Sequence, residues 1–225
     1  MNILAIDSST RYLSLAVASD DKILAYRNED LGRKMSGTIV SRIGRILERV
    51  RMKPADIDGY VAGLGPGSFT SLRVGLATVK GLAFVGNKPV AGIPSLDALA
   101  RSVKKSDHPV CVVADAKRSL VYTGCYTVTE NKLSKTAEYS LTDIQSFLDQ
   151  LPAPAVFIGD GAALYEKEIR KSKKAVELIT APKDVFPQAR YLLQEGARQL
   201  KSAKAAAGSK LIPLYLYTED CQVRP

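Results

Sequence analysis

The chain has 225 residues, of which 46% are hydrophobic and 24% charged, and this composition is typical of one large or two small globular domains. No apolar run approaches the roughly 20 residues that cross a bilayer, so we expect no membrane contact. The formal net charge of +9 permits contact with a polyanion such as tRNA, but the sequence contains no signature of an RNA-binding module.

The cysteines indicate a reducing compartment. Cys111, Cys125 and Cys221 are odd in number and have no metal-ligand spacing. Cys111 and Cys125 lie in apolar, strand-like runs, so we expect buried free thiols there. Because disulfides form mainly in oxidising compartments, the sequence predicts a cytoplasmic protein.

The first half of the chain predicts three strands followed by alternating helices and strands. The strands are expected at 2–6, 12–18 and 22–27, the first helix at 36–51 and the next strand at 59–64. A helix capped by Ser68 or Thr70, a strand at 89–93 and a helix at 95–103 complete this half. Two apolar stripes run along its first two helices, made by Ile39, Ile43, Ile46, Leu47 and Val50 and by Leu72, Leu76, Val79 and Ala83.

The second half repeats the same order of elements. We expect strands at 109–114, 120–129 and 132–139, a helix at 142–151 that Thr142 caps, and a strand at 155–158. A helix at 162–172, a strand at 175–179 and a long helix at about 187–207 follow.

Both halves thus have the order βββαβαβα. This order predicts an α/β protein with two ribonuclease-H-like halves, the layout of the actin/Hsp70/sugar-kinase (ASKHA) superfamily. We place an N-terminal subdomain at 1–103 and a C-terminal subdomain at 104–225. The helix near 187–207 is a candidate to pack back on the N-terminal subdomain.

A glycine-rich turn opens the second helix. The turn and the helix start contain Gly65, Pro66, Gly67, Ser68, Thr70 and Arg73. Such a turn before a helix N-terminus can hold an anion, with Arg73 assisting. However, the segment matches neither the P-loop nor the dinucleotide pattern, and we favour a structural turn in which Gly67 has a positive φ. We expect Arg73 to have a carboxylate or carbonyl partner, and the helix glycines Gly75 and Gly81 to have another chain segment close by.

Two aspartates are the candidates for carboxylate chemistry. Asp7 and Asp115 each end the first strand of a half, and Gly159 and Gly161 form a strand-to-helix turn that could contact phosphate. One alternative is therefore a small ASKHA-type kinase or ATPase that uses these residues with Mg-ATP. The other, which we favour, is that both carboxylates brace strand ends, because Ser8 stands where such kinases have a glycine.

The sequence offers no catalytic centre built on histidine. His108 is the only histidine and lies in a polar segment before Pro109. Neither a pair of histidine metal ligands nor a Ser–His nucleophile is therefore expected. We predict no catalytic residues, no metal site and no cofactor of the chain's own.

Several segments carry a resemblance to a known family. The stretch 65–83 resembles the signature of the TsaB (YeaZ) family, and the segments 3–10, 115–122, 159–162 and 212–216 are also similar to that family. Members of this family are subunits of the bacterial machinery that makes N6-threonylcarbamoyladenosine (t6A) at adenosine 37 of tRNAs that read ANN codons. One departure is Lys34-Met35-Ser36-Gly37, where many members have His-Ser-Glu, so partner contacts in this segment are in doubt.

The resemblance implies a scaffold subunit that does no chemistry. In this family's complex TsaD transfers the threonylcarbamoyl group, the ATPase TsaE joins the assembly, and TsaC supplies threonylcarbamoyl-AMP. ATP and Mg²⁺ are used by the complex. TsaD resembles the chain in fold but carries a metal-binding histidine pair that is missing here. The resemblance implies that the chain holds and activates TsaD, meets tRNA through the complex and forms a homodimer when alone.

The family resemblance also implies where TsaD binds. In the family, the first two helices pair with their counterparts in TsaD to form a four-helix contact. We therefore expect the two apolar stripes to bind TsaD, and to self-associate in its absence. The alternative is that both stripes face only the sheet. Stand-alone RNA binding, a third class of function, rests on net charge alone.

Overall fold

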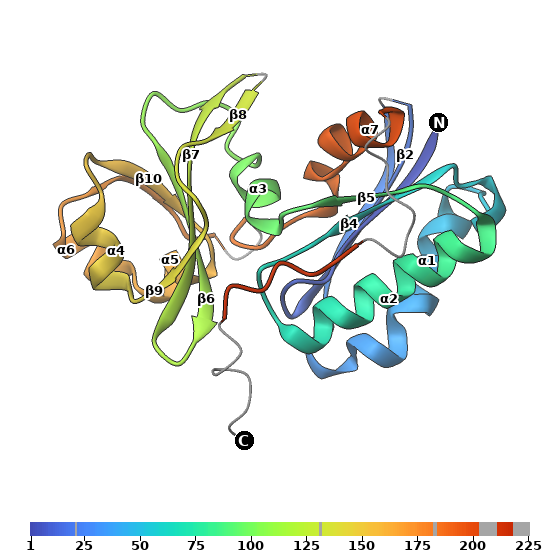
Figure 1. Cartoon of the computed structure of the whole chain (residues 1–225), viewed down its shortest axis with the longest axis horizontal. Helices are drawn as coiled ribbons and strands as arrows, with labels where there is room; N and C mark the ends of the chain where they lie inside the picture. The colour runs from blue at the N-terminus through green and yellow to red at the C-terminus, as the bar shows by residue number, and fades with distance from the viewer. Residues whose placement is uncertain (21, 131, 182–183, 203–210, 218–225) are drawn as a thin grey trace. The chain divides into compact units, whose positions relative to one another are not determined.

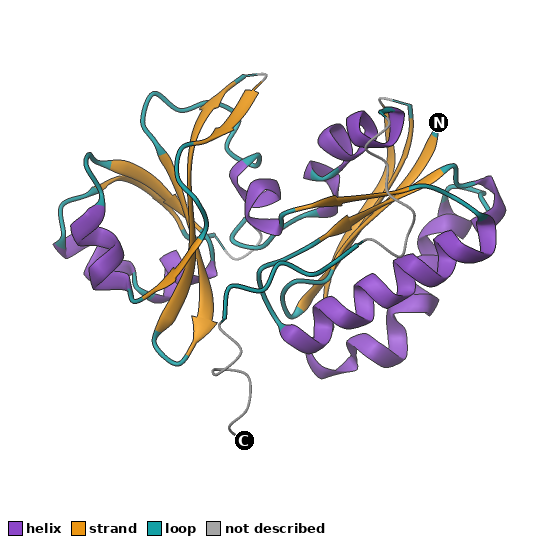
Figure 2. Ribbon diagram, viewed as in Figure 1, coloured by secondary structure: helices purple, strands orange, loops and turns teal. Residues whose placement is uncertain are grey.

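The fold is taken from a computed structural model, which describes residues 1–20, 22–130, 132–181, 184–202 and 211–217 (Figure 1). Contacts divide the chain into two compact units, Met1–Ala98 with Pro187–Leu214 and Leu99–Phe186 with Tyr215–Pro225. Each unit is built around its own sheet, with helices packed on it (Figure 2). Among the described residues, no helix combines the length and apolar character needed to span a membrane.

The first unit has a five-stranded sheet with β1 (Asn2–Asp7) at its centre. The strand order is β3-β2-β1-β4-β5, with β2 at Tyr12–Ser19, β3 at Lys22–Asp30, β4 at Gly59–Gly63 and β5 at Val90–Ile93. β1, β2 and β3 pair antiparallel, whereas β1, β4 and β5 pair parallel. Because side chains alternate along a strand, Leu4 and Ile6 enter one core and Ile3 and Ala5 enter the other.

Helices cover both faces of this sheet. α1 (Met35–Arg49) and α2 (Phe69–Gly86) lie side by side on the face of Leu4 and Ile6 (Figure 1). The opposite face packs against Ala98 of α3 (Ser95–Ala100), the 3-10 helix η3 (Ala189–Tyr191) and α7 (Leu193–Lys201). Two further 3-10 turns, η1 (Gly32–Lys34) and η2 (Pro54–Asp56), flank α1.

The second unit has a six-stranded sheet. Its strands are β6 (Val110–Lys117), β7 (Leu120–Thr129), β8 (Lys132–Lys135), β9 (Ser140–Thr142), β10 (Ala155–Ile158) and β11 (Ala175–Ile179). They run in the order β11-β10-β6-β7-β8, and β9 also pairs with β7. Helices α4 (Ile144–Gln150), α5 (Asp160–Leu164) and α6 (Glu166–Lys171) accompany it, and buried side chains of all three share a core with Cys111, Val113 and Phe157.

Most expected elements are present, but the second half differs in detail. The strand expected at 132–139 ends at Lys135 as β8, and a separate short strand, β9, follows outside the expected bounds at Ser140–Thr142. β8 and β9 pair with different parts of the long strand β7. The helix expected at 162–172 begins at Asp160 and breaks at Tyr165. Asp143, and not Thr142, caps α4, since its side chain accepts a hydrogen bond from the Ser146 N–H at 2.9 Å.

The last expected helix is also shorter. Gln188 has an extended backbone, so the helix expected from 187 begins instead as η3 and continues as α7 from Leu193 to Lys201. The part of this expectation at 203–207 lies outside the described residues. α7 packs against β4 and β5 of the first sheet.

Candidate functional site

The signature turn joins β4 to α2 and is held by the segment after β1. Gly65 has a φ of +86°, in the region that glycine tolerates, and its bond to Pro66 is cis. The Ser68 N–H donates to the Ser9 carbonyl at 2.7 Å, and α2 starts at the next residue. The expected side-chain cap is not formed; the Ser68 hydroxyl instead donates to Ser71 Oγ at 3.1 Å.

Close approach of another chain segment explains two of the glycines in this region. A Cβ on Gly67 would lie 2.0 Å from the Ser9 carbonyl oxygen, although the φ of Gly67 is not positive, so the expected reason for this glycine is wrong. A Cβ on Gly75 would lie 2.0 Å from Ser8 Oγ, which donates to the Ser71 carbonyl at 2.9 Å. The close neighbour expected at Gly75 is therefore present, whereas nothing lies within 4 Å of the same position on Gly81.

Asp7 is the centre of a buried hydrogen-bond network. Its carboxylate accepts from the Ser9 N–H at 2.9 Å, from Ser9 Oγ at 2.6 Å and from Ser95 Oγ at 2.7 Å. The Ser95 hydroxyl in turn accepts from the Gly65 N–H at 3.0 Å. Burial raises the pKa of Asp7, and the bonds from Ser9 and Ser95 lower it by less. Asp7 is only 1% exposed, which is the arrangement of a carboxylate that braces strand ends.

The position of this network follows from the sheet. β1, β4 and β5 are parallel neighbours, so their carboxyl ends meet at one edge. Asp7 ends β1, Gly65 follows β4 and Ser95 follows β5. Sequence reasoning assigned neither Ser9 nor Ser95 a role at this carboxylate. A sequence signal could have identified these serines. Each is a hydroxyl residue that closely follows a strand of the same parallel set as β1, which ends at Asp7.

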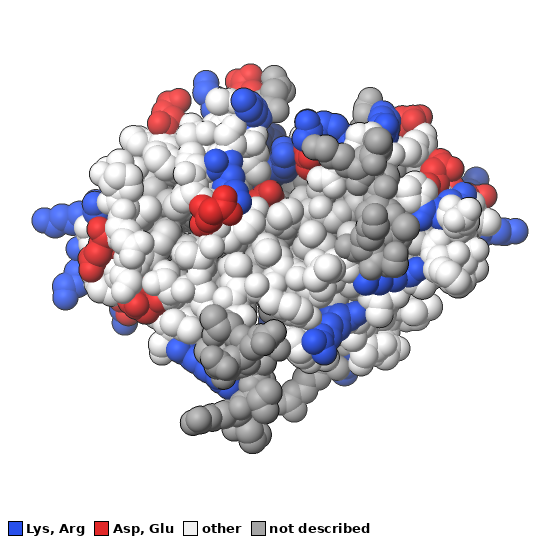
Figure 3. All heavy atoms as spheres, viewed as in Figure 1, with Lys and Arg blue, Asp and Glu red and all other residues white. Residues whose placement is uncertain are grey.

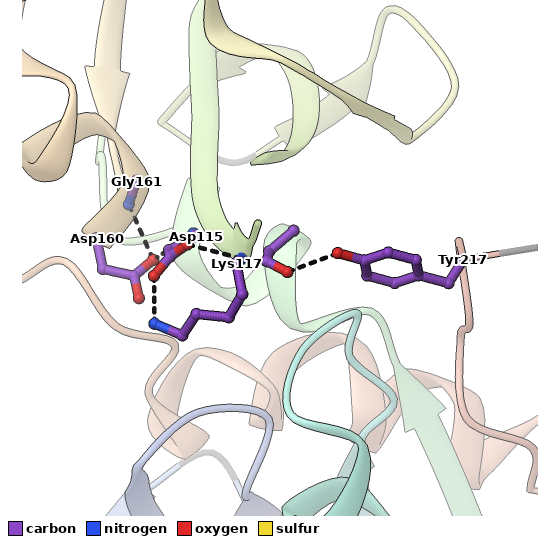
Figure 4. Close-up of polar contacts among 6 residues, drawn as sticks. Asp115, Lys117, Asp160, Gly161 and Tyr217 are labelled. Carbon is purple, nitrogen blue, oxygen red and sulfur yellow. Dashed lines mark hydrogen bonds and ion pairs between the residues drawn. The ribbon is translucent and has the colours of Figure 1, made fainter. Parts of the chain in front are cut away.

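A second network surrounds Asp115 in the other unit (Figure 4). Asp160 Oδ1 accepts from the Asp115 N–H at 2.9 Å and from the Gly161 N–H at 3.0 Å. Asp115 itself accepts from the Lys117 N–H at 2.8 Å and forms an ion pair with Lys117 Nζ. Gly159 has a φ of +126°, and a Cβ there would lie 2.1 Å from the Val113 carbonyl oxygen.

These contacts determine what the turn at 159–161 can bind. The Asp160 carboxylate takes the two backbone N–H groups that an anion would need, and sequence reasoning missed both Asp160 and Lys117. Burial raises the pKa of Asp160, while the Asp115 N–H lowers it and the Asp115 charge raises it.

Tyr217 contacts the same strand, β6, that carries Asp115. Its hydroxyl donates to the Ala116 carbonyl at 2.7 Å (Figure 4). Across the described residues, no group of three or more His, Cys, Asp or Glu side chains could hold a metal ion.

The two apolar stripes of α1 and α2 form the core of the first unit. Eight of these nine side chains are at most 5% exposed, and Val50 is partly buried against the same cluster, which contains Ile39, Ile43, Ile46, Leu47, Leu76, Val79 and Ala83. Leu72 is fully buried as well. The expectation that these side chains bind a partner is therefore wrong for the folded chain. An amphipathic helix packs its apolar face on the sheet of its own chain, and here the stripes of both helices are used to cover one face of that sheet.

The outward faces of the same helices carry small and apolar residues. Phe84 and Val85 are 87% and 88% exposed, and Val40 is 68% exposed. Among the small residues, Gly37 and Ser41 of α1 and Ala77 and Gly81 of α2 are also exposed. The Arg73 guanidinium lies 3.7 Å from the centroid of the Phe69 ring, which is a cation–π contact.

The charged side chains do not gather into one basic area on the face shown in Figure 3. Lys and Arg are dispersed there, and Asp and Glu lie among them. The face drawn in Figure 3 therefore shows no single basic patch for a polyanion.

Comparison with known proteins identifies the family. Residues 29–221 match the family model described as "TsaD: tRNA N6-adenosine threonylcarbamoyltransferase". The chain is also 27% identical to the tRNA threonylcarbamoyladenosine biosynthesis protein TsaB of Bacillus subtilis, over 100% of this chain and 97% of that protein. The chain belongs to the TsaD family, in its TsaB (YeaZ) group. The resemblance seen in the signature segment is thereby confirmed.

Solved structures agree with the TsaB (YeaZ) assignment at the level of the fold. YeaZ from Pseudomonas aeruginosa has a TM-score of 0.80 at 22% identity, over 96% of this chain and 100% of that chain. Component A of (R)-2-hydroxyglutaryl-CoA dehydratase from Acidaminococcus fermentans, an ASKHA-type protein, has a TM-score of 0.55 at 13% identity, over 90% of this chain and 100% of that chain. The expected α/β fold of the ASKHA class is confirmed.

Proposed function

We propose that this chain is the TsaB-type subunit that holds and activates TsaD while t6A is made on tRNA. The observation that carries the proposal is the match to the TsaD family model in a chain that contains a single histidine, His108. A metal-dependent transferase centre of the kind implied for TsaD needs two histidine ligands. A chain with the shared fold and without those ligands is suited to a supporting role.

The internal use of the two candidate aspartates supports a non-catalytic role. Asp7 is buried and accepts three hydrogen bonds from Ser9 and Ser95. Asp115 is paired with Lys117, and Asp160 takes the N–H groups of the neighbouring turn. These carboxylates are engaged by the protein itself, so we propose that the chain has no cofactor of its own and that Mg-ATP is used elsewhere in the assembly.

We propose that TsaD binds the outward face of α1 and α2. This face exposes Val40, Phe84 and Val85, and exposed apolar side chains of this size lose contact with water when a partner covers them. The small residues Ala77 and Gly81 leave room for a partner helix to approach α2 closely. The same face would join two copies of the chain when TsaD is absent. We propose that TsaE and tRNA contact the chain only as parts of the assembly, and that TsaC supplies the threonylcarbamoyl-AMP that TsaD uses.

The proposal is tested by binding and by reconstitution. The variant Ala77→Arg adds a large charged side chain at an exposed position of α2, and Gln150→Arg, at an exposed position of α4 in the other unit, is the matched control. We expect Ala77→Arg to weaken binding to purified TsaD at least tenfold, which is about 1.4 kcal/mol. Gln150→Arg should bind as the unchanged chain does. Equal TsaD affinity of both variants would show that the interface lies elsewhere.

Reconstitution separates the supporting role from an enzymatic one. The isolated chain should neither modify tRNA nor hydrolyse Mg-ATP, and TsaD, TsaE, TsaC, threonine, bicarbonate and ATP should form t6A only when the chain is added. ATP hydrolysis by the isolated chain, lost in Asp115→Asn, would instead establish the kinase-like alternative.

A further inference from the structure

Two cysteines face each other across neighbouring strands of the second unit. Cys111 of β6 and Cys125 of β7 are direct partners in the antiparallel register. Their sulfur atoms lie 3.4 Å apart, and both thiols are free. The signature segments and the proposed TsaD contact make no use of this pair.

The register at this pair is compatible with a disulfide between the two strands. Residues directly opposite in an antiparallel pair have Cα atoms about 4.5 or 5.5 Å apart, and disulfides span about 4.4–6.8 Å. Only the side chains must turn to bring the sulfur atoms from 3.4 Å to bonding distance. The strands need not change their register.

The two thiols differ in exposure and in acidity. Cys111 is fully buried in the core with Val113 and Phe157, whereas Cys125 is partly exposed. The hydrogen bond that the two thiols share lowers the pKa of Cys125, and the same bond together with burial raises the pKa of Cys111. The thiolate is the form that reacts with oxidants. Because Cys125 is the more exposed thiol and the one whose pKa is lowered, we expect dissolved oxidants to react with Cys125 before Cys111.

We propose that Cys111 and Cys125 are a peroxide-sensitive thiol pair that closes to an intramolecular disulfide between β6 and β7. The Cys125 thiolate attacks one oxygen of a hydroperoxide, the O–O bond breaks, and Cys125 becomes a sulfenic acid while water or an alcohol leaves. Cys111 Sγ then attacks Cys125 Sγ, the S–O bond breaks, and water leaves after the Cys111 proton is transferred. Two thiols are oxidised by two electrons and one hydroperoxide is reduced.

The test follows the thiols in the full-length folded chain. The protein is treated with hydrogen peroxide, alkylated, digested without reduction and analysed by mass spectrometry, alongside Cys125→Ser and Cys221→Ser variants. We expect a peptide pair linked through Cys111 and Cys125 with a loss of two hydrogens, and its disappearance after a dithiol reductant. Cys221→Ser should form the same link, and Cys125→Ser should leave Cys111 unoxidised.

A second experiment, in denaturant, tests whether the pairing of β6 with β7 in the folded chain is what favours the disulfide. In denaturant, the Cys111–Cys125 disulfide should be reduced by a less reducing glutathione buffer than in the folded chain, because the paired strands no longer hold the two sulfur atoms together. Three outcomes would overturn the proposal: both thiols stay free in the folded chain, Cys125 oxidises to a sulfinic acid without linking to Cys111, or the link joins two chains.

Discussion

A pair of glycine substitutions on α2 tests the contact between that helix and the segment after β1. Gly75 faces Ser8, whose hydroxyl would lie 2.0 Å from an added Cβ, whereas Gly81 has nothing within 4 Å of the same position. Both glycines lie in the interior of one helix. The gain in helix propensity, about 1 kcal/mol for Gly→Ala, is therefore nearly the same in Gly75→Ala and Gly81→Ala and cancels in their comparison.

The contact between position 75 and Ser8 therefore determines how far the free energies of unfolding of the two variants differ. In Gly75→Ala the Ser8 hydroxyl must move, so its buried bond to the Ser71 carbonyl is lost at a cost of about 1–3 kcal/mol. Overpacking of the helix against the strand end adds about 1–3 kcal/mol. We therefore expect Gly75→Ala to be less stable than Gly81→Ala by about 2–6 kcal/mol. Gly81→Ala should itself be as stable as the unchanged chain or up to about 1 kcal/mol more stable.

Urea unfolding followed by circular dichroism at neutral pH measures this difference. Ser8→Gly removes the obstructing side chain, so adding it to Gly75→Ala should recover much of the loss, which a double-mutant cycle quantifies. If Gly75→Ala and Gly81→Ala unfold at the same urea concentration, the close approach of Ser8 to α2 does not carry the energy assigned to it here.

Three further predictions concern the same unit. Ile43→Asp places a carboxylate in the core, where Ile43 is 3% exposed, and should destabilise the unit by at least about 3 kcal/mol, seen as loss of helical signal. Gly67→Val puts a side chain against the Ser9 carbonyl and should cost about 1–3 kcal/mol in urea unfolding. In Asp7→Asn the residue cannot ionise. Because burial raises the folded pKa of Asp7 above its unfolded value near 3.9, stability of the unchanged chain relative to Asp7→Asn should fall as pH rises above about 3.9.

Each of these has an outcome that contradicts it. A folded Ile43→Asp that loses only TsaD binding would mean that the stripe faces the partner after all. Gly67→Val with unchanged stability would show that the turn can move away from Ser9. A stability difference between the unchanged chain and Asp7→Asn that is independent of pH would show that the folded pKa of Asp7 is not raised.

The order of elements could be predicted because each strand or helix has its own hydrophobic period. β1 is apolar from Ile3 to Ile6 and α1 has its stripe at three- and four-residue spacing, and both formed as expected. The errors arose where a neighbour decides the local structure. Nothing between 132 and 139 in the sequence indicates that β7 is long enough to pair with β8 and β9 at two separate places.

The candidate site was predictable in its residues but not in its contacts. The apolar stripes were found, but periodicity tells only that a face is covered and not whether a sheet or a partner covers it. Gly67 was singled out for its φ, while the reason is the position of Ser9, which lies far away in the sequence. Asp160 was missed although Gly159 and Gly161 beside it were named, because its role depends on the N–H of Asp115 on another strand.

The path of the chain has a consequence for synthesis on the ribosome. The first unit needs Pro187–Leu214, and α7 supplies Leu193 and Leu200 to the core against Val61. Domains generally complete in the order in which they leave the ribosome. Here the segment Leu99–Phe186 emerges whole before α7 does, so the unit that starts second has most of its chain available first. Until α7 emerges, one face of the β1-centred sheet lacks that cover, and a nascent chain stalled before residue 187 should expose apolar surface to chaperones.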